Sequence, residues 1–134
     1  MKKRIAALLS AVGMMIAGLL IVSAPQAQAG FYDCSGAYDG SNSLCVYTDI
    51  NWGGTADYWN VTNPTSLSTT FKARISSVSN WSHTSAWCLY DRENHTGNKL
   101  IVDAWKDMPD LRAFNRTWWG DDWNDAVQSI KRSC

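Results

Sequence analysis

The chain has 134 residues, no formal net charge and four cysteines. This length allows one domain or two small ones, and it excludes most large enzyme architectures. Acidic and basic residues are equal in number. Because nucleic-acid binding needs a basic surface, we expect no nucleic-acid partner.

The first 29 residues have the composition of an export signal. Three basic residues, Lys2, Lys3 and Arg4, precede an apolar run over 5–22, and Ala27-Gln28-Ala29 closes the segment. This order is typical of a bacterial secretory signal peptide. A membrane anchor is disfavoured, because the run is near the lower length limit of a span and no basic flank follows it. We predict a signal peptide over 1–29 and secretion of 30–134, with no membrane partner in the mature form.

The predicted mature chain has 105 residues, nine of them basic and twelve acidic, for a net charge of −3. It keeps all eight tryptophans and all four cysteines. An exported chain with an even cysteine count is best explained by disulfides. Three pairings are possible, and we favour Cys34 with Cys45 and Cys88 with Cys134. Metal ligation by cysteine is disfavoured, because no pair has Cys-x-x-Cys spacing.

The mature chain contains an internal repeat. At an offset of 43 residues, Cys45, Tyr47, Asn51 and Gly54 match Cys88, Tyr90, Asn94 and Gly97. Further along, 75–78 matches 127–130 at an offset of 52, so the second copy carries about nine extra residues within 102–123. Two copies of one unit of about 45–50 residues indicate a duplicated fold.

Each copy has the pattern of β structure. Over 44–47 the aliphatic Leu44 and Val46 alternate with Cys45 and Tyr47, as on a strand with two distinct faces. We expect further short strands at 75–78 and 99–102. Glycine-containing turns follow at 51–54 and 94–98. Only 107–114 suits a short helical turn. We therefore predict an all-β sandwich.

Aromatic and glycine residues at fixed spacing resemble the βγ-crystallin Greek key. The spacing runs from Tyr47 through Trp52 to Gly54, and it recurs from Tyr90 through His95 to Gly97. The run 123–129 is similar to the closing motif of that unit. The resemblance implies a disulfide-stapled sandwich of two Greek keys, over about 43–80 and 86–134.

A narrower resemblance is to the actinobacterial secreted metalloproteinase-inhibitor family, which has this fold. It rests on the signal peptide, the early cysteine pair Cys34 and Cys45, and the Cys-Val-Tyr run that begins at Cys45. It implies a secreted inhibitor that occludes the cleft of an extracellular protease. The reactive loop does not carry over by residue, and we look for it in 103–123. The alternative is a non-inhibitory module that binds a cell-surface ligand, a carbohydrate or calcium, or acts as an antimicrobial toxin.

The crystallin resemblance also raises the question of calcium. The family loop reads Asn/Asp, Asn/Asp, two residues, Ser/Thr, Ser, and its oxygens suit a hard cation. The first copy, 72–77, keeps both serines but lacks both acidic or amide positions, and Lys72 and Arg74 place positive charge there. The second, 124–129, keeps the Asn-Asp pair but has glutamine in place of the hydroxyl residue. Candidate ligands are Ser76, Asn124, Asp125 and Gln128, although neither copy is complete. We expect no other cofactor.

The tryptophans divide into two groups. We expect Trp52, Trp59, Trp81, Trp87 and Trp105 to pack in the core or on a sheet, since aromatics dominate small cores. The run 118–123 combines aromatic and acidic residues, and Trp118, Trp119, Asp121 and Asp122 are candidate partner-binding residues. If 118–119 is extended, one of the two rings is exposed. The alternative is that both rings cover a sheet edge.

No pattern points to catalysis. The two histidines, His83 and His95, form no metal-binding helix pair, and neither a nucleophile elbow nor a phosphate-binding loop is present. The carboxylates at 121–125 are better explained as solvated surface groups than as a glycosidase pair. We predict a monomeric binding protein and not an enzyme.

Overall fold

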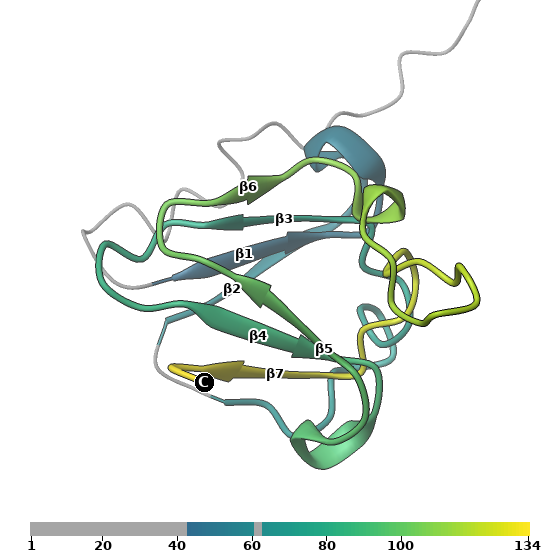
Figure 1. The fold of residues 1–134 in the computed structure, drawn as a ribbon. Helices are drawn as coiled ribbons and strands as arrows, with labels where there is room; N and C mark the ends of the chain where they lie inside the picture. Colours follow the sequence, from purple (N-terminus) through teal and green to yellow (C-terminus); the bar gives the residue numbers. More distant parts are fainter. Residues whose placement is uncertain (1–42, 61–62) are drawn as a thin grey trace, which may run out of the picture.

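The computed structural model describes residues 43–60 and 63–134, which form two antiparallel sheets packed face to face (Figure 1). The first sheet has the order β2-β1-β3-β6, with β1 at Leu44–Tyr47, β2 at Ala56–Trp59, β3 at Ser77–Asn80 and β6 at Asp107–Met108. The second has the order β5-β4-β7, with β4 at Trp87–Tyr90, β5 at Lys99–Val102 and β7 at Ser129–Arg132. The predicted all-β sandwich is confirmed. The predicted signal peptide and Cys34 lie outside the described residues.

Three 3₁₀ turns complete the described elements: η2 at Ile50–Trp52, η3 at Glu93–His95 and η4 at Leu111–Ala113. The last of these is the short helical turn expected within 107–114. In the described part of the chain, no helix has the length and hydropathy needed to cross a membrane.

The two repeats exchange one segment each. Strand β6 follows β5 in the second repeat, yet it pairs with β3 of the first (Figure 1). In return, Pro64–Leu67 of the first repeat lies beside β7: the Ile130 N–H donates to Pro64 O (3.1 Å) and the Leu67 N–H to Gln128 O (2.9 Å). A strand that crosses to the facing sheet is the topology of a Greek key. The exchange makes the two repeats a single hydrophobic unit.

Alternation along β1 explains why both of its faces are buried. Leu44 and Val46 face the main core between the sheets, while Cys45 and Tyr47 belong to a second cluster on the outer face. Full burial of such aliphatic side chains stabilises the fold by about 1.5–3 kcal/mol each. The main core consists of Leu44, Val46, Leu67, Phe71, Ile75, Val78, Trp87, Leu89, Val102, Met108, Leu111, Trp123, Val127 and Ile130.

The expected packing of five tryptophans is correct for four of them. Trp87 is fully buried, and Trp52, Trp59 and Trp81 are half-buried. Trp105 is 57% exposed, which corrects the expectation. It lies in the turn between β5 and β6, with a positive φ of 57°, and is not part of the main core cluster.

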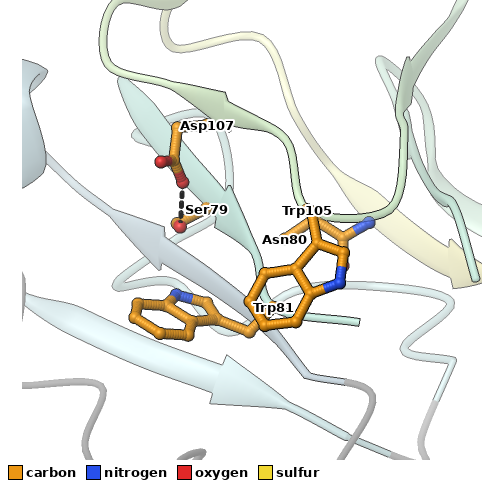
Figure 2. A pocket seen from close by; sticks show the side chains of 5 residues that line it. All are labelled: Ser79, Asn80, Trp81, Trp105 and Asp107. Carbon is orange, nitrogen blue, oxygen red and sulfur yellow. Dashed lines mark hydrogen bonds between the residues drawn. The ribbon is translucent and has the colours of Figure 1, made fainter. Parts of the chain in front are cut away.

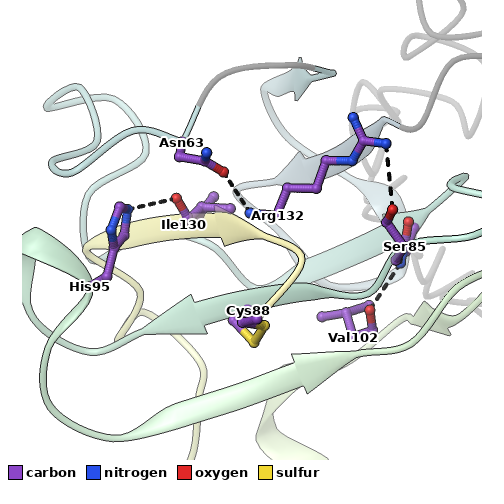
Figure 3. Close-up of a disulfide and its surroundings, with 9 residues drawn as sticks. Asn63, Ser85, Cys88, His95, Val102, Ile130 and Arg132 are labelled. Carbon is purple, nitrogen blue, oxygen red and sulfur yellow. Dashed lines mark hydrogen bonds between the residues drawn. A yellow bond between two sulfur atoms is a disulfide. The ribbon is translucent and has the colours of Figure 1, made fainter.

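Cys88 and Cys134 form a disulfide, as predicted (Figure 3). Their Cα atoms lie 6.1 Å apart, and the bond links β4, which contains Cys88, to Cys134, which follows β7. Close to it, a ring nitrogen of His95 lies 3.0 Å from Ile130 O (Figure 3). The predicted bond between Cys34 and Cys45 involves a residue outside the described part.

The matched asparagines and glycines form the same folded turn in each repeat. In the second, Asn94 and His95 both have φ of 56°, and the Ser129 hydroxyl donates to Arg92 O (2.6 Å) while it accepts the His95 N–H (3.1 Å). Gly97 has φ of 82°, and a Cβ there would collide with an oxygen of Asp91. The first repeat has the same arrangement. Asn51 and Trp52 have positive φ, the Ser77 hydroxyl donates to Asp49 O and accepts the Trp52 N–H, and Gly54 again has a positive φ.

Candidate functional site

The extra residues of the second repeat fold into a hairpin that extends from one side of the sandwich (Figure 1). We call residues 115–122 the Trp hairpin. Its ends form an antiparallel bridge between Asn115 and Asp122, and Trp118 and Trp119 lie at its tip. The two side chains are 96% and 90% exposed. Apolar surface of this size on a small protein indicates an interaction site.

This geometry differs from both expectations for the two rings. Residues 118 and 119 lie in a turn and are not extended, so their side chains are not sent to opposite faces. Neither ring covers a sheet edge. Gly120 permits the turn with φ of 91°, and its N–H donates to Thr117 O (3.3 Å).

The base of the Trp hairpin is fixed to the core. Trp123, the next residue, is 1% exposed and belongs to the main cluster. Its N–H lies within hydrogen-bond distance of Leu111 O (3.3 Å) and Phe114 O (3.1 Å). One tryptophan therefore anchors the segment while two others face solvent.

An ion pair braces the hairpin from the side. Arg116 Nη1 lies 3.1 Å from Asp91 Oδ2, and Arg116 Nε donates to Asp122 O (3.2 Å). The Asp91 side chain is only 5% exposed, and it also accepts the backbone N–H and the side-chain amide of Asn98, both at 2.8 Å. A hydrogen-bonded pair with one buried partner holds its geometry better than a surface pair.

The internal repeat explains the origin of this brace. At the position that matches Asp91, the first repeat has Thr48, whose hydroxyl accepts the Thr55 N–H (2.9 Å). The second repeat closes the same turn with a carboxylate, which carries a charge that Arg116 neutralises. Sequence reasoning missed Asp91 and Arg116. At the offset of 43, an aspartate (Asp91) matches a threonine (Thr48), and this added charge in the second copy was the available signal for a charged partner.

The predicted partner-binding carboxylates also take part in bracing. Asp121 Oδ2 accepts the Thr117 hydroxyl (3.3 Å) and lies 3.5 Å from Arg116 Nη2. Asp122 Oδ1 accepts the Asn124 N–H (2.9 Å). The hairpin therefore presents indole rings, while its carboxylates contact the Thr117 hydroxyl, the Arg116 guanidinium and the Asn124 N–H.

The candidate calcium ligands come together across the repeats and not within one copy. Ser76 Oγ donates to Thr48 O (2.8 Å) and lies 3.4 Å from Asp125 Oδ1. Reciprocal bonds, Ala73 N–H to Val127 O (2.8 Å) and Asp125 N–H to Ile75 O (3.0 Å), cross the two copies. The serine of the first incomplete loop therefore meets the aspartate of the second.

The other candidate ligands fit less well. At the offset of 52, Gln128 matches Ser76 and Ala73 matches Asp125. The pair equivalent to Ser76 and Asp125 is therefore Gln128 and Ala73, and it has no carboxylate. There the Lys72 ammonium bonds Glu93 and holds the pKa of that carboxyl below its ordinary value. Asn124 donates its amide to Asp125 Oδ2 (2.8 Å). Within 43–60 and 63–134, no cluster of three His, Cys, Asp or Glu side chains is arranged to hold a metal.

Comparison with known proteins agrees with the fold. The chain is similar to a βγ-crystallin from an archaeon (15% identity, TM-score 0.56), with 69% of this chain and 98% of that one covered. It is similar to a βγ-crystallin from Ciona intestinalis (20%, 0.54), with 68% and 99% covered, and to a βγ-crystallin domain from Clostridium beijerinckii (25%, 0.51), with 68% and 97% covered. The predicted βγ-crystallin-like sandwich is confirmed.

The family comparison concerns function. No curated protein matches the chain significantly. The model of peptidase inhibitor family I36 matches residues 27–102, which is more than half of the chain. The match supports peptidase inhibition and a peptidase partner, and it indicates that the protein is not an enzyme. The Trp hairpin lies beyond the matched range. The chain belongs to peptidase inhibitor family I36.

Proposed function

We propose that this protein is a secreted inhibitor of metallopeptidases that blocks the substrate cleft with the Trp hairpin. The observation that carries the proposal is the pair of indole rings, Trp118 and Trp119, at the tip of a braced hairpin. The family supplies the class of partner, and the hairpin supplies the contact surface. The disulfide fits the oxidising environment outside the cell.

A cleft inhibitor has to protrude and to keep its shape. Ordering a loop on binding costs about 0.5–1.5 kcal/mol for each immobilised side chain, so a loop that is already ordered binds more tightly. The bond from Arg116 to Asp91 and the buried Trp123 supply that order here. Tryptophan is enriched among the residues that dominate binding energy. The hairpin thus combines rigidity with large apolar side chains.

The metallopeptidase class is supported by the sequence. The export signal, the early cysteines and the Cys-Val-Tyr run resemble secreted metalloproteinase inhibitors. A direct test is a titration of a thermolysin-like metallopeptidase with the purified protein, with a serine peptidase of similar substrate preference as the class control. We expect loss of metallopeptidase activity near one equivalent and full serine-peptidase activity. Full metallopeptidase activity at tenfold excess contradicts the proposal.

The brace yields a prediction with an internal control. Arg116→Met leaves the buried Asp91 carboxylate without its charge partner, which costs about 1–3 kcal/mol of folding stability. The double variant Asp91→Thr with Arg116→Met recreates the neutral closure seen at Thr48 in the first repeat. We expect it to regain stability in urea denaturation but still to inhibit about tenfold more weakly than wild type, because the hairpin is untethered. Recovery of inhibition together with stability shows that the brace has no role in binding.

Calcium is a second proposal, favoured by one observation: Thr48 O, Ser76 Oγ and Asp125 converge. Ca²⁺ takes 6–8 oxygen ligands. Thr48 and Asp125 line a cavity of about 470 Å³ that Arg74 also lines, and its positive charge allows only a weak site. Isothermal titration is expected to give a Kd of about 10⁻⁴–10⁻³ M. Asp125→Asn should abolish the binding heat, whereas Gln128→Ala should leave it unchanged. Equal loss in both variants contradicts the composite site.

A further inference from the structure

A second aromatic site lies at the other end of β6 from the Trp hairpin. A cavity of about 150 Å³ is lined by Ser79, Asn80, Trp81, Trp105 and Asp107 (Figure 2). Pockets that bury drug-sized ligands measure about 300–1,000 Å³, so this one has room for a single small head group. Nothing in the inhibitor account uses it.

Two indole rings form the walls of this cavity. The centroids of Trp81 and Trp105 are 6.4 Å apart and their planes are tilted by 54°. The ring centroids of His83 and Trp105 are 4.2 Å apart, and the backbone N–H of Trp105 donates to Ser82 O (3.1 Å). The exposed Trp105 is therefore held in place by ring contacts with Trp81 and His83 and by its backbone.

A carboxylate completes the lining. Asp107 lies opposite Ser79 in the register of β3 and β6 and accepts the Ser79 hydroxyl (Figure 2). Ser79 is the one described residue that bonds this carboxylate. Because Asp107 is exposed, its remaining acceptor positions are open to a ligand.

The side-chain donors of Ser79 and Asn80 are already used within the protein. The Asn80 side-chain amide donates to Val102 O (2.9 Å) and Ser85 O (3.0 Å), and the Ser79 hydroxyl donates to Asp107. Figure 2 shows the Trp105 indole nitrogen directed away from Asp107. The cavity therefore offers aromatic faces and a negative charge, and the hydroxyl of Ser79 and the amide of Asn80 donate to the protein itself.

We propose that this cavity binds an organic cation of the trimethylammonium class. The negative face of an indole attracts a cation within about 6 Å of its centroid, and quaternary ammonium groups are bound in aromatic cages of this kind. A nearby carboxylate adds attraction at short range. A sugar requires donors as well as acceptors for its hydroxyls, and the committed donors of Ser79 and Asn80 disfavour it.

The test uses choline chloride as the probe and follows the indole N–H signals of the purified protein by NMR, with the Trp105 signal assigned from Trp105→Phe. We expect saturable shifts of that signal with a millimolar Kd. The neutral isostere 3,3-dimethyl-1-butanol should bind at least about tenfold more weakly, because only the charge differs. Equal binding of the two compounds overturns the proposal, as does binding of methyl glucoside in place of choline.

Variants separate this site from the inhibitor surface. Trp105→Ala should abolish choline binding, and Asp107→Asn should weaken it several-fold while the indole spectrum stays dispersed. Trp119→Ala, in the Trp hairpin, should bind choline as wild type does. Phosphatidylcholine vesicles in a sedimentation assay distinguish a free cation from a lipid head group, and either source supports the assigned chemistry. Unchanged choline affinity in both Trp105→Ala and Asp107→Asn rejects the site.

Discussion

Replacing Trp118 or Trp119 by alanine is expected to weaken inhibition of the target metallopeptidase by about 30- to 1,000-fold, the range of an interface hot spot. Both side chains are almost wholly exposed, so their removal takes nothing from the core. The midpoint of thermal unfolding should therefore stay within about 1–2 °C of wild type, since surface substitutions of this kind change stability little. Inhibition constants and unfolding curves of the same preparations measure both effects.

Trp105→Ala is the matched control for these variants. It also removes an exposed tryptophan from a turn, but Trp105 precedes β6, whereas the Trp hairpin follows it. We expect its inhibition constant to equal that of wild type. If the three alanine variants inhibit equally well, the Trp hairpin is not the contact surface.

Loss of the Cys88–Cys134 disulfide is expected to lower the free energy of unfolding by about 4 kcal/mol. The two residues are separated by 46 positions, and the chain-entropy model gives this value for a loop of that length. A domain of this size has only about 5–15 kcal/mol in total, so the effect is large. Urea denaturation of the double variant Cys88→Ala with Cys134→Ala measures it, with alanine chosen because Cys88 is fully buried.

The same variant tests how the loop supports the inhibitor surface. The 88–134 loop contains the whole Trp hairpin and its anchor Trp123. At low temperature, where the double variant is still folded, we expect inhibition to persist, because the brace to Asp91 does not depend on the disulfide. A change in unfolding free energy below about 1 kcal/mol contradicts the stabilising role of the bond.

Much of the fold was predictable because the repeat is visible in the residues that shape its turns. Strands β1 and β5 lie at the expected positions, 44–47 and 99–102. Strand β3 was expected at 75–78 and lies at Ser77–Asn80. The reason is a contact between the repeats: Ile75 O accepts the Asp125 N–H, so this residue belongs to the crossing between copies before the ladder begins.

The candidate sites were less predictable, because they depend on contacts between residues of the two repeats that are far apart in the sequence. Ser76 and Asp125 are 49 positions apart, and only the Greek-key exchange brings their side chains together. Trp105 is of a residue type common in small cores, yet it lies in a left-handed turn and is exposed, which no local sequence pattern indicates. Trp118 and Trp119 were recognised as a candidate surface from their acidic neighbours. Their brace was not, because Asp91 lies 25 positions from Arg116.

Competition kinetics test most directly whether the Trp hairpin occupies the substrate cleft. Initial rates of the metallopeptidase are measured with the protein and a small hydroxamate, which occupies the catalytic metal site, varied together. Cleft occlusion predicts mutually exclusive inhibition: the apparent inhibition constant of the protein rises linearly with hydroxamate concentration, and no ternary complex forms. An inhibition constant that is independent of the hydroxamate contradicts the account, because it places the protein outside the cleft.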